Sequence, residues 1–155
     1  MPTPYELVAA QLEVQQADKG ELVAVSRGME RAALSDPPSV VAATLQDVRH
    51  LTAHTRAVYQ SLAEAGASAT LFARGLQSWV APGVSGVSLD DDDPLVDEWV
   101  VVLPSPQRPA VFAATDLRQP CDEDLERCFL YGISYDRELV DACLRALLAH
   151  AGTPA

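Results

Sequence analysis

The apolar positions near the start of the chain follow a helical period. From residue 5 to residue 17 the pattern predicts a helix that Gly20 closes. A second helix is expected to follow and to end before Asp36-Pro37-Pro38, because proline disfavours a helical residue before it. The apolar face of this second helix has members three or four residues apart, which are Leu22, Val25, Met29 and Ala32.

The same period predicts two more helices. The longest spans residues 44–66, with Thr44 as its expected N-cap, Asp47 three residues on, and Gly66 at its end. Its expected buried stripe consists of Leu45, Val48, Leu51, Thr55, Val58 and Leu62. The last helix begins after Asp136, a good N-cap residue, and should lie on a sheet. Its wide apolar stripe consists of Leu139, Val140, Cys143, Leu144, Leu147 and Leu148.

Between these helices the pattern changes to short apolar runs, which are typical of strands. Strands are predicted in "ATLFARG", "EWVVVLP" and "AVFAATD" and near residues 127–134, and the turn-rich "LQSWVAPGVSGVSL" has room for one short strand. The second and third runs should form a hairpin around the prolines of "SPQRP". Because both arms are nearly continuously apolar, both faces of the sheet are expected to be covered. The order of elements predicts one α+β domain with about four mostly antiparallel strands and helices packed on them.

Composition narrows the classes of partner. The 155 residues are 48% apolar and 21% charged, as in a globular domain, and the formal net charge is -11. Such a charge repels phosphate backbones and anionic membrane surfaces, so we expect no direct binding to nucleic acid or membrane. No apolar stretch approaches the roughly 20 residues of a membrane span. The first residues lack the basic start and apolar core of a secretion signal, so a cytoplasmic location is expected.

The densest polar feature is the run Asp90-Asp91-Asp92-Asp93, which Pro94 follows. Adjacent carboxylates offer oxygen ligands for Ca²⁺, but calcium loops alternate their ligands, and the D-x-[DN]-x-[DN]-G pattern is absent. An Asp-Pro pair instead favours a helix start, with Asp93 as N-cap and Pro94 at the first helical position. The run is therefore predicted to be an exposed loop that binds no specific metal ion.

Two further groups have the spacing of a metal or acid–base site. His50 and His54, four residues apart on the predicted helix, can present two ring nitrogens to one metal ion, with Asp47 as a third ligand. They fall at the edge of the apolar stripe or opposite it, and no HExxH motif is present, so exposed histidines are the favoured interpretation. The carboxylates between Asp90 and Glu98 are the other set that an enzyme could use.

Several polar and aromatic residues are candidates for ligand binding. Ser26 and Glu30, four residues apart, can hydrogen-bond a ligand or each other. Trp99, next to Glu98, either walls a pocket or belongs to the core. The glycine loops of nucleotide-binding proteins, the G-x-S-x-G elbow and CxxC pairs are absent, and the three cysteines lack the surroundings that activate a thiol. We therefore predict that the protein is not an enzyme.

Four pieces of the chain resemble the DICT sensory domain, a family associated with diguanylate cyclases and two-component systems. They are "LVAVSRGMERAA", "LQDVRHLTAHTRAVYQSLAEAG", "DDPLVDEWVVVLPSPQRPAVFAATDL" and "FLYGISYDRELVDACLRALL", and "DDPLVDEW" followed by "VVVL" is the most specific. The resemblance implies an α+β fold with a four-stranded sheet and a sensory role, with light or a small molecule as the signal. It assigns no ligand or catalytic residue. Two positions depart from the family pattern: Leu45 stands where an aromatic residue usually precedes the glutamine, and Tyr131-Gly132-Ile133 stands where the strand often carries Trp.

We interpret the chain as a non-enzymatic sensory module that acts through a signalling partner protein or as a homodimer. It would consist of an N-terminal helical segment for interaction (residues 1–20), the DICT-like domain (residues 21–150) and a disordered tail (residues 151–155). No metal site is predicted, and nothing in the sequence names a cofactor or the small-molecule ligand. The alternatives are a protein-interaction scaffold without a ligand, or an enzyme that uses the Asp90 to Glu98 carboxylates or the His50 and His54 pair. The candidate ligand-binding residues are Ser26, Glu30, Gln46, Tyr59, Glu98, Trp99 and Tyr131.

Overall fold

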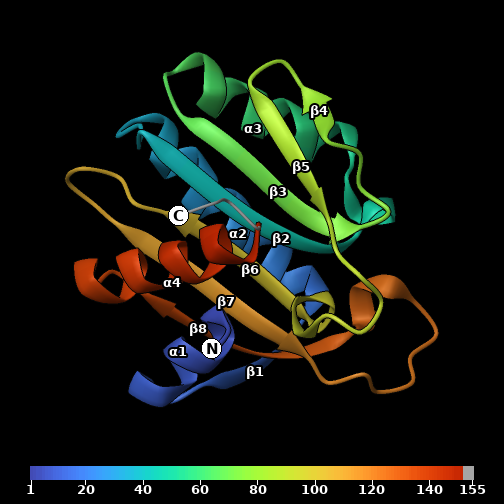
Figure 1. Ribbon diagram of the computed structural model, residues 1–155. Helices are drawn as coiled ribbons and strands as arrows, with labels where there is room; N and C mark the ends of the chain where they lie inside the picture. The colour runs from blue at the N-terminus through green and yellow to red at the C-terminus, as the bar shows by residue number, and fades with distance from the viewer. Residues whose placement is uncertain (152–155) are drawn as a thin grey trace.

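An eight-stranded mixed sheet runs through the protein in the computed structural model, which describes residues 1–151 (Figure 1). The strand order is β1-β8-β7-β6-β2-β3-β5-β4. Neighbouring strands are antiparallel except in the β2–β3 and β3–β5 pairs, which are parallel. The strands are β1 (Gln15–Asp18), β2 (Val40–Asp47), β3 (Ser68–Arg74), β4 (Trp79–Ala81), β5 (Val84–Ser88), β6 (Glu98–Leu103), β7 (Ala110–Asp116) and β8 (Cys128–Ser134).

Helices cover both faces of this sheet. Within residues 1–151, the four α-helices are α1 (Pro4–Gln11), α2 (Lys19–Leu34), α3 (Ala53–Glu64) and α4 (Arg137–His150). The three 3₁₀ helices in the same range are η1 (Val48–His50), η2 (Pro94–Asp97) and η3 (Asp124–Glu126). In Figure 1, α1 and α4 lie in front of the sheet and α2 and α3 behind it. Alternate residues of β6 accordingly belong to two cores: Val101 and Leu103 pack on the α2–α3 side, and Val100 and Val102 on the α1–α4 side. This confirms the prediction that both faces are covered.

Several elements form where local signals predicted them. The β6–β7 hairpin pairs Leu103 with Ala110 across the proline-rich turn, and α2 ends before the Asp36-Pro37-Pro38 stop. Asp136 is the N-cap of α4, and its side chain accepts a hydrogen bond from the Leu139 N–H at 3.0 Å. Each of these signals is a short stretch of sequence that favours one backbone conformation by itself. Contacts with distant residues do not alter that conformation here.

The predicted helix over residues 44–66 is wrong in its first half. Residues 40–47 form β2, a central strand whose residues 41–46 are all buried, and the helix α3 starts only at Ala53, after its N-cap Thr52. A strand buried on both faces is continuously apolar and therefore lacks the two-residue alternation that marks a half-buried strand. The second half is confirmed, because α3 ends beside Gly66, which adopts φ +111°.

The N-terminal prediction is also wrong in part. The first helix ends at Gln11, and residues 15–17, expected to be helical, belong with Asp18 to β1, which pairs with β8 at Tyr131. The count of about four strands, which the family resemblance also implied, becomes eight in a mixed sheet. The strands beyond the predicted ones are β1 at one end of the sheet and β2 at its centre, and the turn-rich segment that was expected to hold one short strand forms two, β4 and β5, at the other end. Apart from Ala151, the predicted tail lies outside the described residues.

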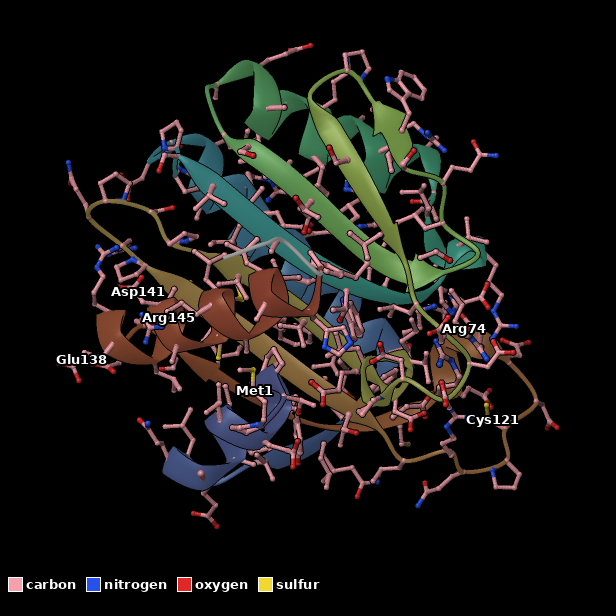
Figure 2. All side chains as sticks on the ribbon, in the orientation of Figure 1. Met1, Arg74, Cys121, Glu138, Asp141 and Arg145 are labelled. Atoms are coloured by element: carbon pink, nitrogen blue, oxygen red, sulfur yellow. The ribbon has the colours of Figure 1, made fainter. Side chains whose placement is uncertain are left out.

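The three cysteines are free thiols in three different surroundings. Cys121 is exposed on the loop after β7, at the opposite end of the molecule from Glu138 of α4 (Figure 2). Cys143 belongs to α4 and is buried on the side of the helix that faces the sheet. Burial and the nearby Glu98 raise its pKa to about 12. A thiol with such a pKa is not a nucleophile at neutral pH.

Packing of α4 supports a test of the core. Leu147 is fully buried, whereas Leu144, expected to be buried with it, is only partly buried at the edge of the same core. Leu147→Ala should lower the free energy of unfolding by about 2–5 kcal/mol, because transfer and cavity terms add, and Leu144→Ala should lower it by less. Denaturant unfolding of both variants measures the difference. Equal losses would mean that α4 docks on the sheet through another face.

Candidate functional site

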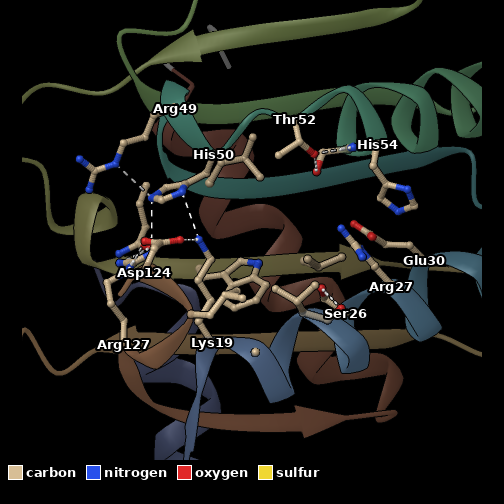
Figure 3. A pocket seen from close by; sticks show the side chains of 18 of the residues that line it. Lys19, Ser26, Arg27, Glu30, Arg49, His50, Thr52, His54, Asp124 and Arg127 are labelled. Carbon is tan, nitrogen blue, oxygen red and sulfur yellow. Dashed lines mark hydrogen bonds and ion pairs between the residues drawn. The ribbon is translucent and has the colours of Figure 1, made fainter. Parts of the chain in front are cut away.

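A cavity of about 490 Å³ lies between α2, α3 and the sheet, with η1 and η3 at one end (Figure 3). We call it the α2–α3 cavity. It gathers side chains that are far apart in the sequence, from α2 near residue 19 to η3 near residue 125. Five of the seven candidate ligand-binding residues line it, and these are Ser26, Glu30, Gln46, Tyr59 and Trp99. Their role in binding a ligand stays a prediction.

The two other candidates lie elsewhere. Glu98 is buried on the α1–α4 face, because successive residues of a strand point to opposite faces and Trp99 faces the cavity. Tyr131 packs beside Phe112, with ring centroids 6.3 Å apart, and its hydroxyl donates to Gln15 Oε1 at 3.3 Å across the β1–β8 pair. Both side chains therefore have structural contacts away from the cavity.

A bulge in β2 brings two consecutive residues to the cavity. The pairing with β3 runs from Thr44 opposite Phe72 directly to Gln46 opposite Ala73, so that Leu45 is an extra residue. Gln46 adopts a left-handed backbone with φ 68°. In a regular strand neighbours point to opposite faces, but here both Leu45 and Gln46 line the cavity.

The hydroxyl of Thr44 fixes the end of the β2–β6 ladder just before this bulge. It donates to the Glu98 carbonyl at 2.8 Å and accepts from the Val100 N–H at 2.9 Å. The two backbone groups flank Trp99, and Thr44 is fully buried. The Thr44 side chain therefore makes the hydrogen bonds that the next backbone groups of β2 would otherwise make to β6. This allows β2 to diverge from β6 where the cavity opens.

Trp99 serves the core and the cavity together. Its ring packs edge-on against Phe112 and Phe129, with centroid distances of 5.1 Å and 5.6 Å. The same side chain lines the cavity and remains only partly buried. The two interpretations of Trp99 as pocket wall and as core residue are thus both correct, because the cavity lies directly above the core of the sheet.

A buried acid–phenol pair lines the cavity beneath α2 and α3. The Tyr59 hydroxyl donates to Glu30 Oε2 at 2.6 Å, and the two residues are 1% and 8% exposed. Burial raises the pKa of Glu30, and the hydrogen bond from Tyr59 only partly offsets this effect. Burial and the Glu30 carboxyl raise the pKa of Tyr59, so the phenol keeps its proton. Ser26, expected to bond either a ligand or Glu30, donates instead to the Val23 carbonyl at 3.2 Å.

Cationic side chains surround His50 at the other end of the cavity. Lys19 Nζ lies 3.2 Å from His50 Nδ1, and Arg127 Nη2 lies 3.4 Å from Nε2. Burial lowers the pKa of His50 to about 4, with Lys19 and Arg127 adding to the effect, so the ring is neutral at pH 7. Sequence reasoning missed Lys19 and Arg127, because residues 19, 50 and 127 carry no common spacing that marks a site.

The possible metal ligands are not arranged as a metal site. His50 belongs to η1 and His54 to α3, so they do not share one helix as predicted, and His54 is exposed. Across residues 1–151, no group of three or more His, Cys, Asp or Glu side chains is placed to hold a metal ion. That the acidic run binds no metal ion stays a prediction.

The acidic run starts a helix, as its Asp-Pro pair predicted. Asp93 is the N-cap of η2, with Pro94 at the first position, and its side chain accepts from the Leu95 N–H at 2.9 Å. Asp93 also pairs with His150 at the end of α4. Asp90, Asp91 and Asp92 are exposed.

Comparison with known sequences identifies the family. The sequence model of the family described as "Sensory domain in DIguanylate Cyclases and Two-component system" matches residues 5–117. The chain belongs to the DICT family. No curated protein matches it. Across residues 1–151 of this DICT protein, no helix has the length and apolar character needed to cross a membrane.

Two solved structures share the fold of this DICT protein. The polyphosphate kinase from Porphyromonas gingivalis is 14% identical, with a TM-score of 0.61 over 100% of this chain and 28% of that chain. TrmBL2, an archaeal chromatin protein whose structure is described as showing a novel mode of DNA binding, is 10% identical, with a TM-score of 0.54 over 96% of this chain and 57% of that chain. At such identities the similarity is one of fold.

Substitutions of Thr44 test how much its hydroxyl stabilises the strand end at which the cavity opens. Thr44→Val keeps the side-chain shape but leaves the Glu98 carbonyl and the Val100 N–H without their shared partner. It should therefore cost about 1–3 kcal/mol of unfolding free energy for each group left unpaired. Thr44→Ser keeps the hydroxyl and should cost less. Denaturant unfolding compares the two, and equal costs would show that the methyl group, not the hydroxyl, matters at this position.

The raised pKa of Glu98 predicts that the free energy of unfolding depends on pH. Burial raises its pKa to about 7, and hydrogen bonds with Thr3 and from the Tyr5 N–H, at 3.0 Å from Oε1, only partly oppose this. Since the folded pKa lies above the unfolded value, the contribution of Glu98 is complete at acid pH and is lost as the pH rises through 7. Between about pH 5 and pH 8 the wild type should lose about 2–3 kcal/mol relative to Glu98→Gln. Parallel pH profiles of the two would refute this assignment.

Proposed function

We propose that this DICT domain detects a small molecule bound in the α2–α3 cavity and passes the signal to a partner protein or to a second copy of the chain. The family is a sensory domain. The proposal adds a binding site for the signal. It rests chiefly on one observation: five of the residues that the sequence pattern marks as ligand-binding candidates line one cavity.

The size and lining of the cavity support a ligand of ordinary metabolite size. Its volume of about 490 Å³ lies within the range of roughly 300–1,000 Å³ that is typical of small-molecule sites. Trp99, Leu45 and Val101 give an apolar floor, and polar groups stand at both ends. A mixed lining of this kind orients a ligand through a few polar contacts while burying its apolar part.

The positions of the carboxylates count against the enzyme alternative. Asp90, Asp91 and Asp92 are exposed on a loop, whereas Glu98 is buried beneath α1 on the opposite face from the cavity. These groups do not converge on one reacting atom, which general acid–base catalysis requires. The scaffold alternative requires no cavity at all, and the α2–α3 cavity therefore favours the sensor.

The N-terminal segment packs on its own domain. Val8 of α1 is fully buried against the α4 side of the sheet, and Thr3 and Glu6 form a capping box at the start of the helix. Apart from Met1, the large apolar side chains of residues 1–20 are buried or partly buried by the domain itself. We therefore assign the interaction with a partner to no particular face. In any such complex the ligand acts only if it binds two arrangements with different affinity.

Native mass spectrometry of protein purified from its own host tests the proposal. The wild type should carry a bound small molecule, and Ser26→Met should lose most of it, because the longer side chain at a buried position of α2 fills the cavity. Ala57→Met, on an exposed position of α3 outside the cavity lining, is the matched control and should keep the ligand. Circular dichroism confirms that each variant is folded.

Two results would contradict the proposal. If the wild-type protein from its host carries no bound small molecule, the proposal that the domain binds a ligand fails. Equal occupancy in Ser26→Met and Ala57→Met would place the ligand outside the α2–α3 cavity.

A further inference from the structure

We propose that the ligand of the α2–α3 cavity carries an oxyanion, a carboxylate or a phosphate, which binds beside Arg49, His50 and Arg127. This inference rests on the proposed function, because it names the chemistry of the molecule that the same cavity would hold. It is carried by an excess of hydrogen-bond donors at one end of the cavity. Figure 3 shows that end, where Lys19, Arg49, His50, Asp124 and Arg127 meet.

The donors around His50 cannot all be satisfied by the protein. Lys19 Nζ approaches Nδ1 at 3.2 Å, while Arg49 Nε and Arg127 Nη2 approach Nε2 at 3.5 Å and 3.4 Å. Lysine and arginine only donate, and a neutral imidazole has one N–H and one acceptor nitrogen. If Nδ1 accepts from Lys19, the Nε2–H points at two guanidinium groups; in the other tautomer, the Nδ1–H points at the ammonium group.

Protonation of His50 does not remove this conflict. The imidazolium has two N–H groups and no acceptor, so both ring nitrogens would then face cationic donors. The low pKa of His50, about 4, follows from burial and from this cationic surrounding. What the cluster lacks is an acceptor between the ring and the two guanidinium groups, and an oxyanion supplies several lone pairs at once.

The charges of the protein leave room for this anion. Asp124 pairs with both Lys19 and Arg127, and Asp116 Oδ2 lies 2.7 Å from Arg127 Nη1. Within residues 1–151, Arg49 forms no ion pair. The cluster thus holds three permanent cations and the carboxylates of Asp116 and Asp124. Asp47, whose pKa Arg49 and His50 also lower, is paired with Arg74 at 3.3 Å, so counting this pair leaves the excess of one positive charge unchanged in a protein whose net charge is -11. A local positive excess in such an acidic protein favours binding of an anion here over the rest of the surface.

The rest of the cavity favours an organic anion over an inorganic ion. About 490 Å³ is far more than a phosphate ion fills, and the floor beyond the cationic cluster consists of Leu45, Trp99 and Val101. A planar apolar body attached to the oxyanion would cover this floor and lie on the exposed part of the Trp99 ring. The ligand class is therefore an aromatic carboxylate or an aromatic phosphate ester.

A fluorescence titration tests the inference with simple probes. The protein has two tryptophans, Trp79 and Trp99. Trp79 is 67% exposed and lies outside the cavity lining, so Trp79→Phe leaves Trp99 as the single reporter. Benzoate and phenyl phosphate are the anionic probes, and benzamide is the neutral probe of the same shape. Nitrogen-15 NMR of the His50 ring provides a second readout, since a bound anion should raise the pKa of His50 above about 4.

Arg49→Gln and Arg31→Gln are the matched variants. Both remove one exposed arginine that forms no ion pair within the described part of the chain, but only Arg49 lines the cavity. We expect an anionic probe to bind about tenfold more tightly than benzamide, as for one charge-assisted hydrogen bond. Arg49→Gln should remove most of this preference, and Arg31→Gln should keep it. Tighter binding of benzoate or of phenyl phosphate then distinguishes a carboxylate ligand from a phosphorylated one.

The outcomes separate this inference from the proposed function. Benzamide binding as tightly as both anions, or a preference that survives Arg49→Gln, overturns the oxyanion and leaves a cavity that binds neutral molecules. If no probe changes the Trp99 or His50 signals, the oxyanion inference also fails. The proposed function fails separately, when the wild type isolated from its host carries no small molecule.

Discussion

The hydroxyl group of Thr44 is the contact on which the site depends. By bonding the backbone on both sides of Trp99, it ends the β2–β6 ladder without leaving a buried carbonyl or N–H unpaired. The bulge that follows turns Leu45 and Gln46 to the same face, and the chain then runs into η1 with Arg49 and His50. One buried hydroxyl thus allows a central strand to leave its neighbour and form the floor and one end of a cavity.

Arg127 connects that bulge to the cationic end of the cavity. Its guanidinium donates to Asp116 and to Gln46 Oε1, and its Nε lies 2.8 Å from Asp124 Oδ1. Because guanidinium is a planar fork with five donors, one side chain can hold β2, β7 and η3 together and still direct a donor toward His50. The arrangement is preorganised, since most of its hydrogen bonds form without a ligand and an anion would add only the missing acceptor.

Sequence reasoning succeeded where the determining signal is local and failed where pairing is distant. Asp136, the Asp93-Pro94 pair and the proline-rich hairpin turn each determine their own backbone, so α4, η2 and the β6–β7 hairpin were predictable. The strand β1 exists because Gln15 pairs with Tyr131, which no short window contains. The same contrast holds for the residues of the cavity. Candidates on α2, such as Ser26 and Glu30, could be found from helical spacing. The approach of residues 19, 49, 50 and 127 follows only from the fold.

Glu98 and Trp99 show what adjacency in a strand means for function. The sequence placed them in one candidate site, but the strand directs Trp99 into the cavity and Glu98 toward the N-terminus of α1, where it accepts the Tyr5 N–H. The titration of Glu98 near pH 7 therefore concerns the docking of residues 1–11 and the stability of the fold. Charge changes inside the cavity belong to Glu30 and His50 instead. Since the pKa of His50 is about 4, its ring is neutral at physiological pH, and the positive charge that would attract an anion comes from Lys19, Arg49 and Arg127.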